Sequence, residues 1–217
     1  MTSPTDLAAL LCSRLCHDML SPVGAISNGL ELLADEQDPE MREQCLQLLE
    51  HSARISADKL KFFRLAFGAA GGFGEAVPIE EAQEVVSALA LDAKKVQLNW
   101  AILQPSLPKP AAKVLLNLAQ IALDALVRGG TLDIGAEMRE GNMEIVARAS
   151  GPKIAFDEAI GRALQGELED HAITSRTAAA HMIALLAEEL GGGLQYALSE
   201  EALVLGAVLP QPDGMIG

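Results

Sequence analysis

Two long stretches of helical periodicity, residues 6–34 and 39–67, constrain the fold of this chain more than any other feature. In each stretch the apolar side chains recur every three or four residues, which gathers them on one face of a helix. Asp38 and Pro39 lie between the stretches, and this pair is typical of a helix N-cap followed by the first helical residue. Because the turn is so short, the two helices are predicted to form a hairpin.

The apolar faces of this hairpin are wider than one partner helix can cover. The positions that extend them are Leu11, Leu15, Met19, Ile26, Leu33, Leu49 and Leu60. A monomer would leave these side chains in water, and soluble monomers rarely expose an apolar patch of that length. Pairing two hairpins about a two-fold axis would bury them, so the sequence predicts a homodimer with a four-helix bundle.

A glycine-rich stretch at residues 69–74 ends the helical pattern and is predicted to be a linker. We therefore expect two domains, residues 1–70 and residues 71–217. In the second, we expect helices at 78–91, 109–127, 156–165 and 174–190, and strands at 96–101, 131–138, 143–149, 194–198 and 202–209. The predicted fold class is α+β, with the N-terminal two-helix hairpin followed by an α/β sandwich in which helices cover a sheet.

The composition restricts the partners and the compartment. The formal net charge is −14 and the 16 Lys and Arg residues are scattered, whereas nucleic acids and anionic membranes bind clustered basic side chains. No apolar run approaches the roughly 18 residues that span a bilayer, and the N-terminus lacks the pattern of a signal peptide. We expect a cytoplasmic protein that binds neither nucleic acid nor membrane.

The three cysteines, Cys12, Cys16 and Cys45, are an odd number without the spacing of a disulfide scaffold, which fits a reducing compartment. Cys12 and Cys16 are one helical turn apart, which could suggest a metal pair. Both lie on the apolar arc, however, where free cysteine packs as a small hydrophobe. We therefore predict no metal site.

The segment CHDMLSPVGAI, residues 16–26, holds the candidate functional residues. His17 lies roughly opposite the centre of the apolar arc, so its imidazole should face solvent instead of the core. Mostly small side chains stand near it on the same face, where another protein could approach closely. The predicted partner-binding residues are Ser13, Arg14, Leu20, Ser21 and Gly24. From these residues alone, a solvated histidine without a function stays open as the alternative.

Asp18 and Pro22 add chemistry to this histidine. Asp18 points to a different side of the helix, yet its carboxylate could orient the imidazole or take its proton, and a neutral ring nitrogen is what attacks phosphorus. Pro22 cannot donate to the Asp18 carbonyl, so the helix should kink or loosen just past His17. The plainer alternatives are a solvent-facing carboxylate and a tolerated kink without function.

The order H-D-M-L-S-P, from His17 to Pro22, resembles the phosphoacceptor box of two-component sensor histidine kinases. In that box a histidine, an acidic neighbour and a proline five residues on recur. The order of elements in the second domain is similar to that of the ATP-binding domain of those kinases. The resemblance implies that His17 is the phosphoacceptor and that Asp18 assists it.

The nucleotide boxes of the second domain depart from the kinase pattern. Ile121 stands where the resemblance implies a metal-holding asparagine, Ala149 where it implies the aspartate for adenine, and Lys153 where it implies a glycine. Residues 175–179, SRTAA, replace a glycine-rich box. A nucleotide site needs a carboxylate, a Mg²⁺ ligand and glycines that admit the phosphates. We therefore expect a degenerate ATP-binding domain without a cofactor.

A phosphoacceptor hairpin joined to a kinase-like domain without ATP chemistry is similar to the alphaproteobacterial histidine phosphotransferases of the ChpT type. This resemblance implies a dimeric relay that passes a phosphoryl group between receiver-domain aspartates through His17, with Mg²⁺ on the receiver. The partners it implies are the receiver of a CckA-like hybrid kinase and CtrA-like and CpdR-like response regulators. Two alternatives stay open: an autophosphorylating kinase with an atypical ATP site, and a dimeric adaptor whose histidine is incidental.

Overall fold

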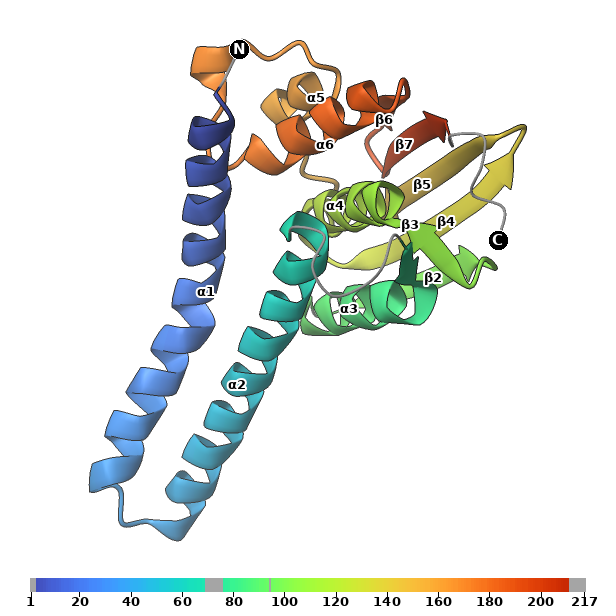
Figure 1. The fold of residues 1–217 in the computed structure, drawn as a ribbon. Helices are drawn as coiled ribbons and strands as arrows, with labels where there is room; N and C mark the ends of the chain where they lie inside the picture. The colour runs from blue at the N-terminus through green and yellow to red at the C-terminus, as the bar shows by residue number, and fades with distance from the viewer. Residues whose placement is uncertain (1–2, 69–75, 94, 211–217) are drawn as a thin grey trace.

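The computed structural model describes residues 3–68, 76–93 and 95–210 of the 217-residue chain. Figure 1 shows a long helical hairpin that extends from one side of a layer of helices and strands. The hairpin consists of α1 (Pro4–Asp35) and α2 (Pro39–Phe67), as predicted. The predicted linker at 69–74, and with it the boundary between the expected domains, lies outside the described residues.

The remainder of the chain forms an α/β sandwich. Its helices are α3 (Ile79–Asp92), α4 (Lys109–Ala125), α5 (Glu158–Leu164) and α6 (Ala178–Glu189), with the 3₁₀ turn η1 (Asp170–Ala172). Its strands are β1 (Ala76–Pro78), β2 (Val96–Ile102), β3 (Ser106–Pro108), β4 (Gly130–Arg139), β5 (Asn142–Ser150), β6 (Gly193–Leu198) and β7 (Ala202–Pro210).

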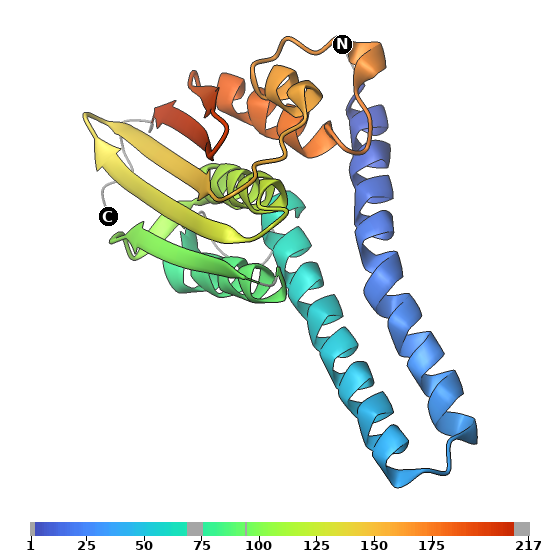
Figure 2. The ribbon, with the colours of Figure 1, turned by 180° about the vertical axis from the view of Figure 1, so that it is seen from behind.

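Five strands form one sheet in the order β2-β4-β5-β7-β6. β2 and β4 pair in parallel, and the other neighbours pair antiparallel. Helices α3, α4 and α6 pack on one face of this sheet, as Figure 2 shows from behind. Burial alternates along β5 and β7, because every second side chain points toward these helices. The predicted α+β fold is confirmed.

Three features of the sandwich differ from the prediction, and one is the 3₁₀ turn η1, which lies where no element was expected. β1 and β3 form a small antiparallel sheet that was not predicted, because each has three residues and ends in a proline directly before a helix. Helix α6 begins at residue 178 instead of 174. The four residues before it form a turn, in which Thr177 Oγ1 accepts a hydrogen bond from the backbone N–H of Thr174 at 3.0 Å.

Capping side chains set where the hairpin helices begin. The side chain of Ser3 caps α1. At the start of α2, Asp38 Oδ1 accepts hydrogen bonds from the backbone N–H groups of Glu40 and Met41 at 2.9 and 3.1 Å. Pro39 follows at the first helical position, where its missing N–H would have no helical partner anyway. The turn predicted at Asp38 and Pro39 therefore rests on local chemistry.

Pro22 lies in the interior of α1, and the helix continues through it without a break. Since proline has no N–H, the carbonyl of Asp18 one turn earlier loses its usual helical partner. Lys59 on α2 supplies another, because its Nζ donates to the Asp18 carbonyl at 3.2 Å. The proline thus frees a carbonyl of α1 for a cation of α2, at the place where the sequence predicts that the helix loosens.

The C-terminal end of α2 belongs to the core of the sandwich. Phe62, Phe63, Leu65 and Ala66 are buried and join one apolar cluster with α3, α4 and the sheet. The buried Asn117 of α4 also donates through Nδ2 to the Ala66 carbonyl, at the long distance of 3.5 Å. Among the described residues, hairpin and sandwich therefore share one core.

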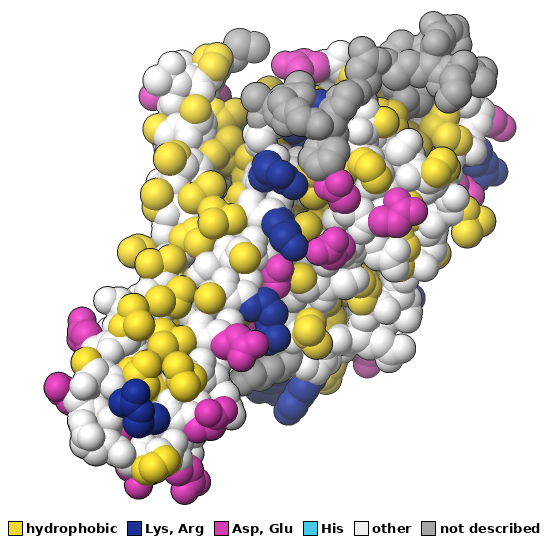
Figure 3. Space-filling view, turned by 60° about the horizontal axis from the view of Figure 1, so that its bottom comes forward, with side chains coloured by type: hydrophobic (Ala, Val, Ile, Leu, Met, Phe, Trp, Pro, Cys, Tyr) yellow, Lys and Arg dark blue, Asp and Glu magenta, His cyan; other side chains and the backbone are white. Residues whose placement is uncertain are grey.

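The hairpin keeps an apolar face in contact with solvent (Figure 3). Its exposed large apolar side chains are Leu20, Val23, Leu30, Leu32, Met41, Leu46, Leu48 and Leu60. Cys12 and Cys16 are exposed as well, while Cys45 is buried. Of the other positions predicted to need cover, Leu11, Leu15, Met19, Ile26, Leu33 and Leu49 are half-buried. Separately, no helix in the described part of the chain is long and apolar enough to cross a membrane.

Leu65→Ala should destabilise the sandwich although Leu65 belongs to the hairpin. Removing a buried leucine side chain costs about 2–5 kcal/mol of unfolding free energy, and the shared core should pass this loss to the sheet. Trp100, the single tryptophan, lies on β2, so its fluorescence reports the unfolding of the sandwich. In urea, the midpoint of the Trp100 transition should fall.

Leu103→Ala is the matched control, since Leu103 is 97% exposed and Leu65 only 7%. Its effect on the unfolding free energy should stay within about 0.5 kcal/mol. If Leu65→Ala left the Trp100 transition where it is in the unaltered protein, the hairpin and the sandwich would unfold independently, and the shared core would have no energetic consequence.

Lys59→Met should lower the unfolding free energy by about 1 kcal/mol, because the Asp18 carbonyl loses its donor. In a Pro22→Ala background the same change should cost less, since the restored N–H can reach that carbonyl within the helix. A double-mutant cycle measured by urea unfolding gives the coupling directly. Equal costs in the two backgrounds would show that Lys59 does not replace the missing N–H.

Candidate functional site

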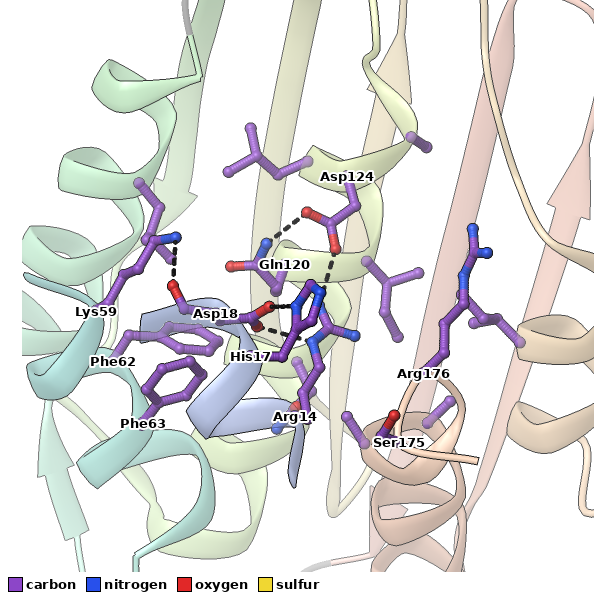
Figure 4. Close-up of a pocket in the computed structure, with 18 of the residues that line it drawn as sticks. Arg14, His17, Asp18, Lys59, Phe62, Phe63, Gln120, Asp124, Ser175 and Arg176 are labelled. Atoms are coloured by element: carbon purple, nitrogen blue, oxygen red, sulfur yellow. Dashed lines mark hydrogen bonds and ion pairs between the residues drawn. The ribbon is translucent and has the colours of Figure 1, made fainter. Parts of the chain in front are cut away.

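His17 lies on α1 where the hairpin faces the sandwich, beside a cleft of about 640 Å³ (Figure 4). Side chains from α1, α2, α3 and α4 line this cleft together with residues of the segments 155–160 and 175–180. The His17 side chain is 84% exposed, as the helical wheel predicts. A ring this open can be reached by a group on another protein.

The imidazole contacts the side chain of the next residue. His17 Nδ1 lies 3.3 Å from Asp18 Oδ1. A carboxylate beside Nδ1 favours the neutral tautomer that carries its proton on that nitrogen, because the N–H can then donate to the carboxylate. This tautomer leaves Nε2 with a lone pair, which is the form of a ring nitrogen that can act as a nucleophile.

Asp18 is held at both its backbone and its side chain. Its carbonyl accepts from Lys59 of α2, and its second carboxylate oxygen, Oδ2, accepts from Arg14 Nε at 2.8 Å. The two carboxylate oxygens are therefore divided, with Oδ1 near His17 and Oδ2 on Arg14. Because the Asp18 side chain is only 23% exposed, its orientation is set mainly by protein groups.

Arg14 also reaches the sandwich. Its Nη2 lies 3.3 Å from Asp124 Oδ2 on α4, and Asp124 Oδ1 accepts from Gln120 Nε2 at 2.7 Å. Burial acts to lower the pKa of Arg14, but Asp18 and Asp124 raise it above the ordinary value, so the guanidinium stays charged. Desolvation by the surrounding protein raises the pKa of the Asp124 carboxyl, although about half of the side chain is exposed to solvent. The positive charge of Arg14 opposes that rise.

The predicted partner-binding residues fall into two groups. Ser13, Leu20 and Ser21 are exposed, and apart from the adjoining helix backbone and the two chain neighbours no atom lies within 4 Å of the place where a side chain at Gly24 would begin. These residues leave room around the imidazole. Arg14 differs, because its guanidinium is already paired with two carboxylates. Pro22 is buried and acts on the site through the carbonyl it frees.

Three residues of the site were missed by the sequence analysis: Lys59, Gln120 and Asp124. One signal could have indicated the last two. In the apolar helix α4, Asn117, Gln120 and Asp124 recur at intervals of three and four residues, which places them along one side of the helix. A polar stripe on a buried helix predicts a polar neighbour, although not which one. Nothing in the sequence near Lys59 marks it.

The residues that depart from the kinase boxes lie in apolar or open surroundings. Ile121 is buried in the wall of the cleft, and Ala149 is fully buried on β5. Lys153 is exposed. In the segment that replaces the glycine-rich box, Arg176 lines the cleft and its Nε lies 3.4 Å from Asp157 Oδ2. Within residues 3–68, 76–93 and 95–210, no three His, Cys, Asp or Glu side chains cluster as metal ligands would.

Comparison with known proteins identifies the family. The family model of the histidine phosphotransferase C-terminal domain matches residues 79–202 of this chain. Protein phosphotransferase ChpT of Brucella abortus (strain 2308) is 35% identical over 205 residues, covering 94% of this chain and 96% of that protein. A solved structure of a bacterial phosphotransferase has a TM-score of 0.83 at 33% identity, covering 95% of this chain and 98% of that one.

A histidine kinase domain from Erythrobacter litoralis, part of a blue-light-activated kinase, has a TM-score of 0.50 at 12% identity and covers 87% of this chain and 95% of its own. At so low an identity the likeness shows a common fold alone. The match to ChpT extends over nearly the whole chain, hairpin and sandwich together. The predicted resemblance to histidine phosphotransferases of the ChpT type is thus confirmed, and this chain belongs to the histidine phosphotransferase family.

Proposed function

We propose that His17 accepts a phosphoryl group from the aspartyl phosphate of one receiver domain and passes it to an aspartate of another. The observation that carries this proposal is the exposed imidazole whose Nδ1 faces the Asp18 carboxylate at 3.3 Å. Membership of the histidine phosphotransferase family supports it independently. The exposed ring offers Nε2 to an incoming receiver while Asp18 holds the opposite side.

In the forward step the lone pair of Nε2 attacks phosphorus, a nitrogen–phosphorus bond forms, and the oxygen–phosphorus bond of the aspartyl phosphate breaks. The receiver regains its carboxylate. His17 then carries the phosphoryl group on Nε2 and its proton on Nδ1, so the ring gains positive charge that the Asp18 carboxylate offsets. The second step reverses these bonds on another receiver. Such transfers depend mainly on positioning and charge stabilisation.

We propose that the protein needs no cofactor of its own and that the Mg²⁺ for the transfer is held by the receiver. Ile121 and Ala149 are buried apolar side chains, so neither offers a ligand to a metal or to adenine.

The receivers we propose are those of a CckA-like hybrid kinase and of CtrA-like and CpdR-like regulators. They would dock on the face formed by Ser13, Leu20, Ser21 and Gly24.

We further propose that the chain forms a homodimer through the hairpin. Cys16, Val23 and Leu30 recur every seven residues along α1, and all three are exposed in the single chain. A second series, Cys12, Met19, Ile26 and Leu33, has the same period and lies between them. Two interleaved apolar series of this kind form the seam of a helical bundle. His17 follows Cys16 and points to another side, so the dimer would leave it open.

His17→Gln should abolish labelling by a receiver that carries radioactive phosphoryl on its aspartate, without loss of folding, because the side chain is exposed. Asp18→Asn should slow the transfer by about tenfold or more, since general acid–base and orienting groups commonly contribute 10²-fold or greater.

The label on the wild type should be lost in acid and kept in base. Incubation of the wild type with Mg-ATP alone should give no label, whereas the kinase alternative requires one.

Val23→Glu combined with Leu30→Glu should convert the dimer into a monomer, because two charges per chain would be buried in the seam. Light scattering after gel filtration should return twice the chain mass of 22.8 kDa for the wild type and one chain mass for the variant. Leu91→Glu is the control, since Leu91 is 78% exposed but lies on α3 in the sandwich. A wild type that elutes as a folded monomer would overturn the proposed bundle.

A further inference from the structure

We infer that Asp124 of the sandwich is a positioning residue for the phosphoacceptor, and that it acts through Arg14 and Asp18 on His17. This inference rests on the proposed function, since it names residues that prepare the same histidine. It assigns the sandwich a part in the chemistry, although that domain has lost the groups a nucleotide would need.

The contacts form one chain of side chains from α4 to the imidazole (Figure 4). Gln120 donates to Asp124, Asp124 accepts from Arg14, and Arg14 donates to Asp18. Asp18 in turn lies beside Nδ1 of His17. Each member uses one atom for the residue before it and another for the residue after it, so the orientation of one constrains the next.

Arg14 is the branch point of this chain. Its Nε and Nη2 are fixed in one plane, so a carboxylate on each nitrogen determines how the whole guanidinium lies. Asp18 and Asp124 take these places at 2.8 and 3.3 Å. Without Asp124, the guanidinium could rotate about the remaining bond, and the Asp18 oxygen that faces His17 would be less well oriented.

Asp124 is poorly placed to serve stability alone. Desolvation raises the pKa of its carboxyl, so folding disfavours the charged form. An ion pair whose carboxylate partner is half exposed also contributes little to folding. The ion pair between Asp124 and Arg14 therefore gives the sandwich only a modest structural benefit. It does give the sandwich a fixed carboxylate against Arg14, 110 residues away in the sequence.

The nitrogen NMR signals of the histidine side chains test this inference without any phosphodonor. The protein has four histidines, and the signals lost in His17→Gln identify those of His17. In the wild type we expect mainly the tautomer with its proton on Nδ1. In Asp124→Asn the populations should shift toward the tautomer with its proton on Nε2, and Asp124→Glu should restore part of the wild-type signal.

Two variants make the test specific. Asp92→Asn removes one negative charge from the same cleft, yet Asp92 makes no ion pair with Arg14 in the described residues, so it should leave the His17 signals unchanged. Arg14→Gln should shift them as Asp124→Asn does, and the double variant should shift them no further. Additive shifts would mean that Asp124 acts by a route other than Arg14. Circular dichroism should confirm that all variants are folded.

Kinetics separate positioning from docking. Asp124→Asn should slow phosphorylation of His17 by about fivefold or more both with a phosphorylated receiver and with phosphoramidate, a small donor that needs no docking surface. A loss confined to the receiver would make Asp124 a docking residue and overturn the inference, as would unchanged tautomers in Asp124→Asn. If instead the wild type takes no phosphoryl group from any receiver, the proposed function fails while the tautomer result still decides the inference.

Discussion

The packing of the end of α2 into the sandwich core determines where every other part of the site lies. Burial of Phe62, Phe63 and Leu65 stabilises this junction by about 1.5–3 kcal/mol for each side chain. An exposed ion pair, by contrast, contributes about 0–1 kcal/mol. The apolar junction therefore places α1 opposite α4, and pairs such as Arg14 with Asp124 adjust an arrangement that the core has already fixed.

Within this frame, the site depends on what the chain lacks as much as on what it contains. The missing N–H of Pro22 leaves the Asp18 carbonyl to Lys59, and that contact joins the two helices beside His17. Ile121 offers no polar group either, and its buried apolar side chain lines the cleft. The cleft can thus present its charged groups toward α1 and His17.

Much of the fold followed from the sequence, because it depends on local patterns. The period of the apolar residues and the Asp38-Pro39 cap predicted both hairpin helices, and the helical wheel predicted the exposure of His17. Strands β1 and β3 were missed, since three residues carry too little period to detect. The division into domains near residue 70 lies outside the described residues and stays a prediction.

The site was only half predictable for a different reason. His17 and Asp18 are neighbours in the chain, so their spacing was visible, whereas Lys59 and Asp124 reach the site from 41 and 110 residues away. A helical wheel tells which side of a helix is polar but not which residue of another element lies opposite. Arg14 shows the difficulty, because its place near His17 suggested a partner surface, while the structure pairs it within the chain.

The bracing of Asp18 also bears on how the hairpin could move. A helical hairpin can transmit a signal when one helix turns about its own axis or slides past its neighbour. In this chain, Lys59 joins α1 to α2 at the backbone of Asp18, and Arg14 joins α1 to α4 within one turn of it. Rotation of α1 about its axis would disturb contacts with both neighbours at once. The hairpin is thus suited to keeping α1 in one orientation for successive protein partners. It is poorly suited to relaying a torsional signal along its length.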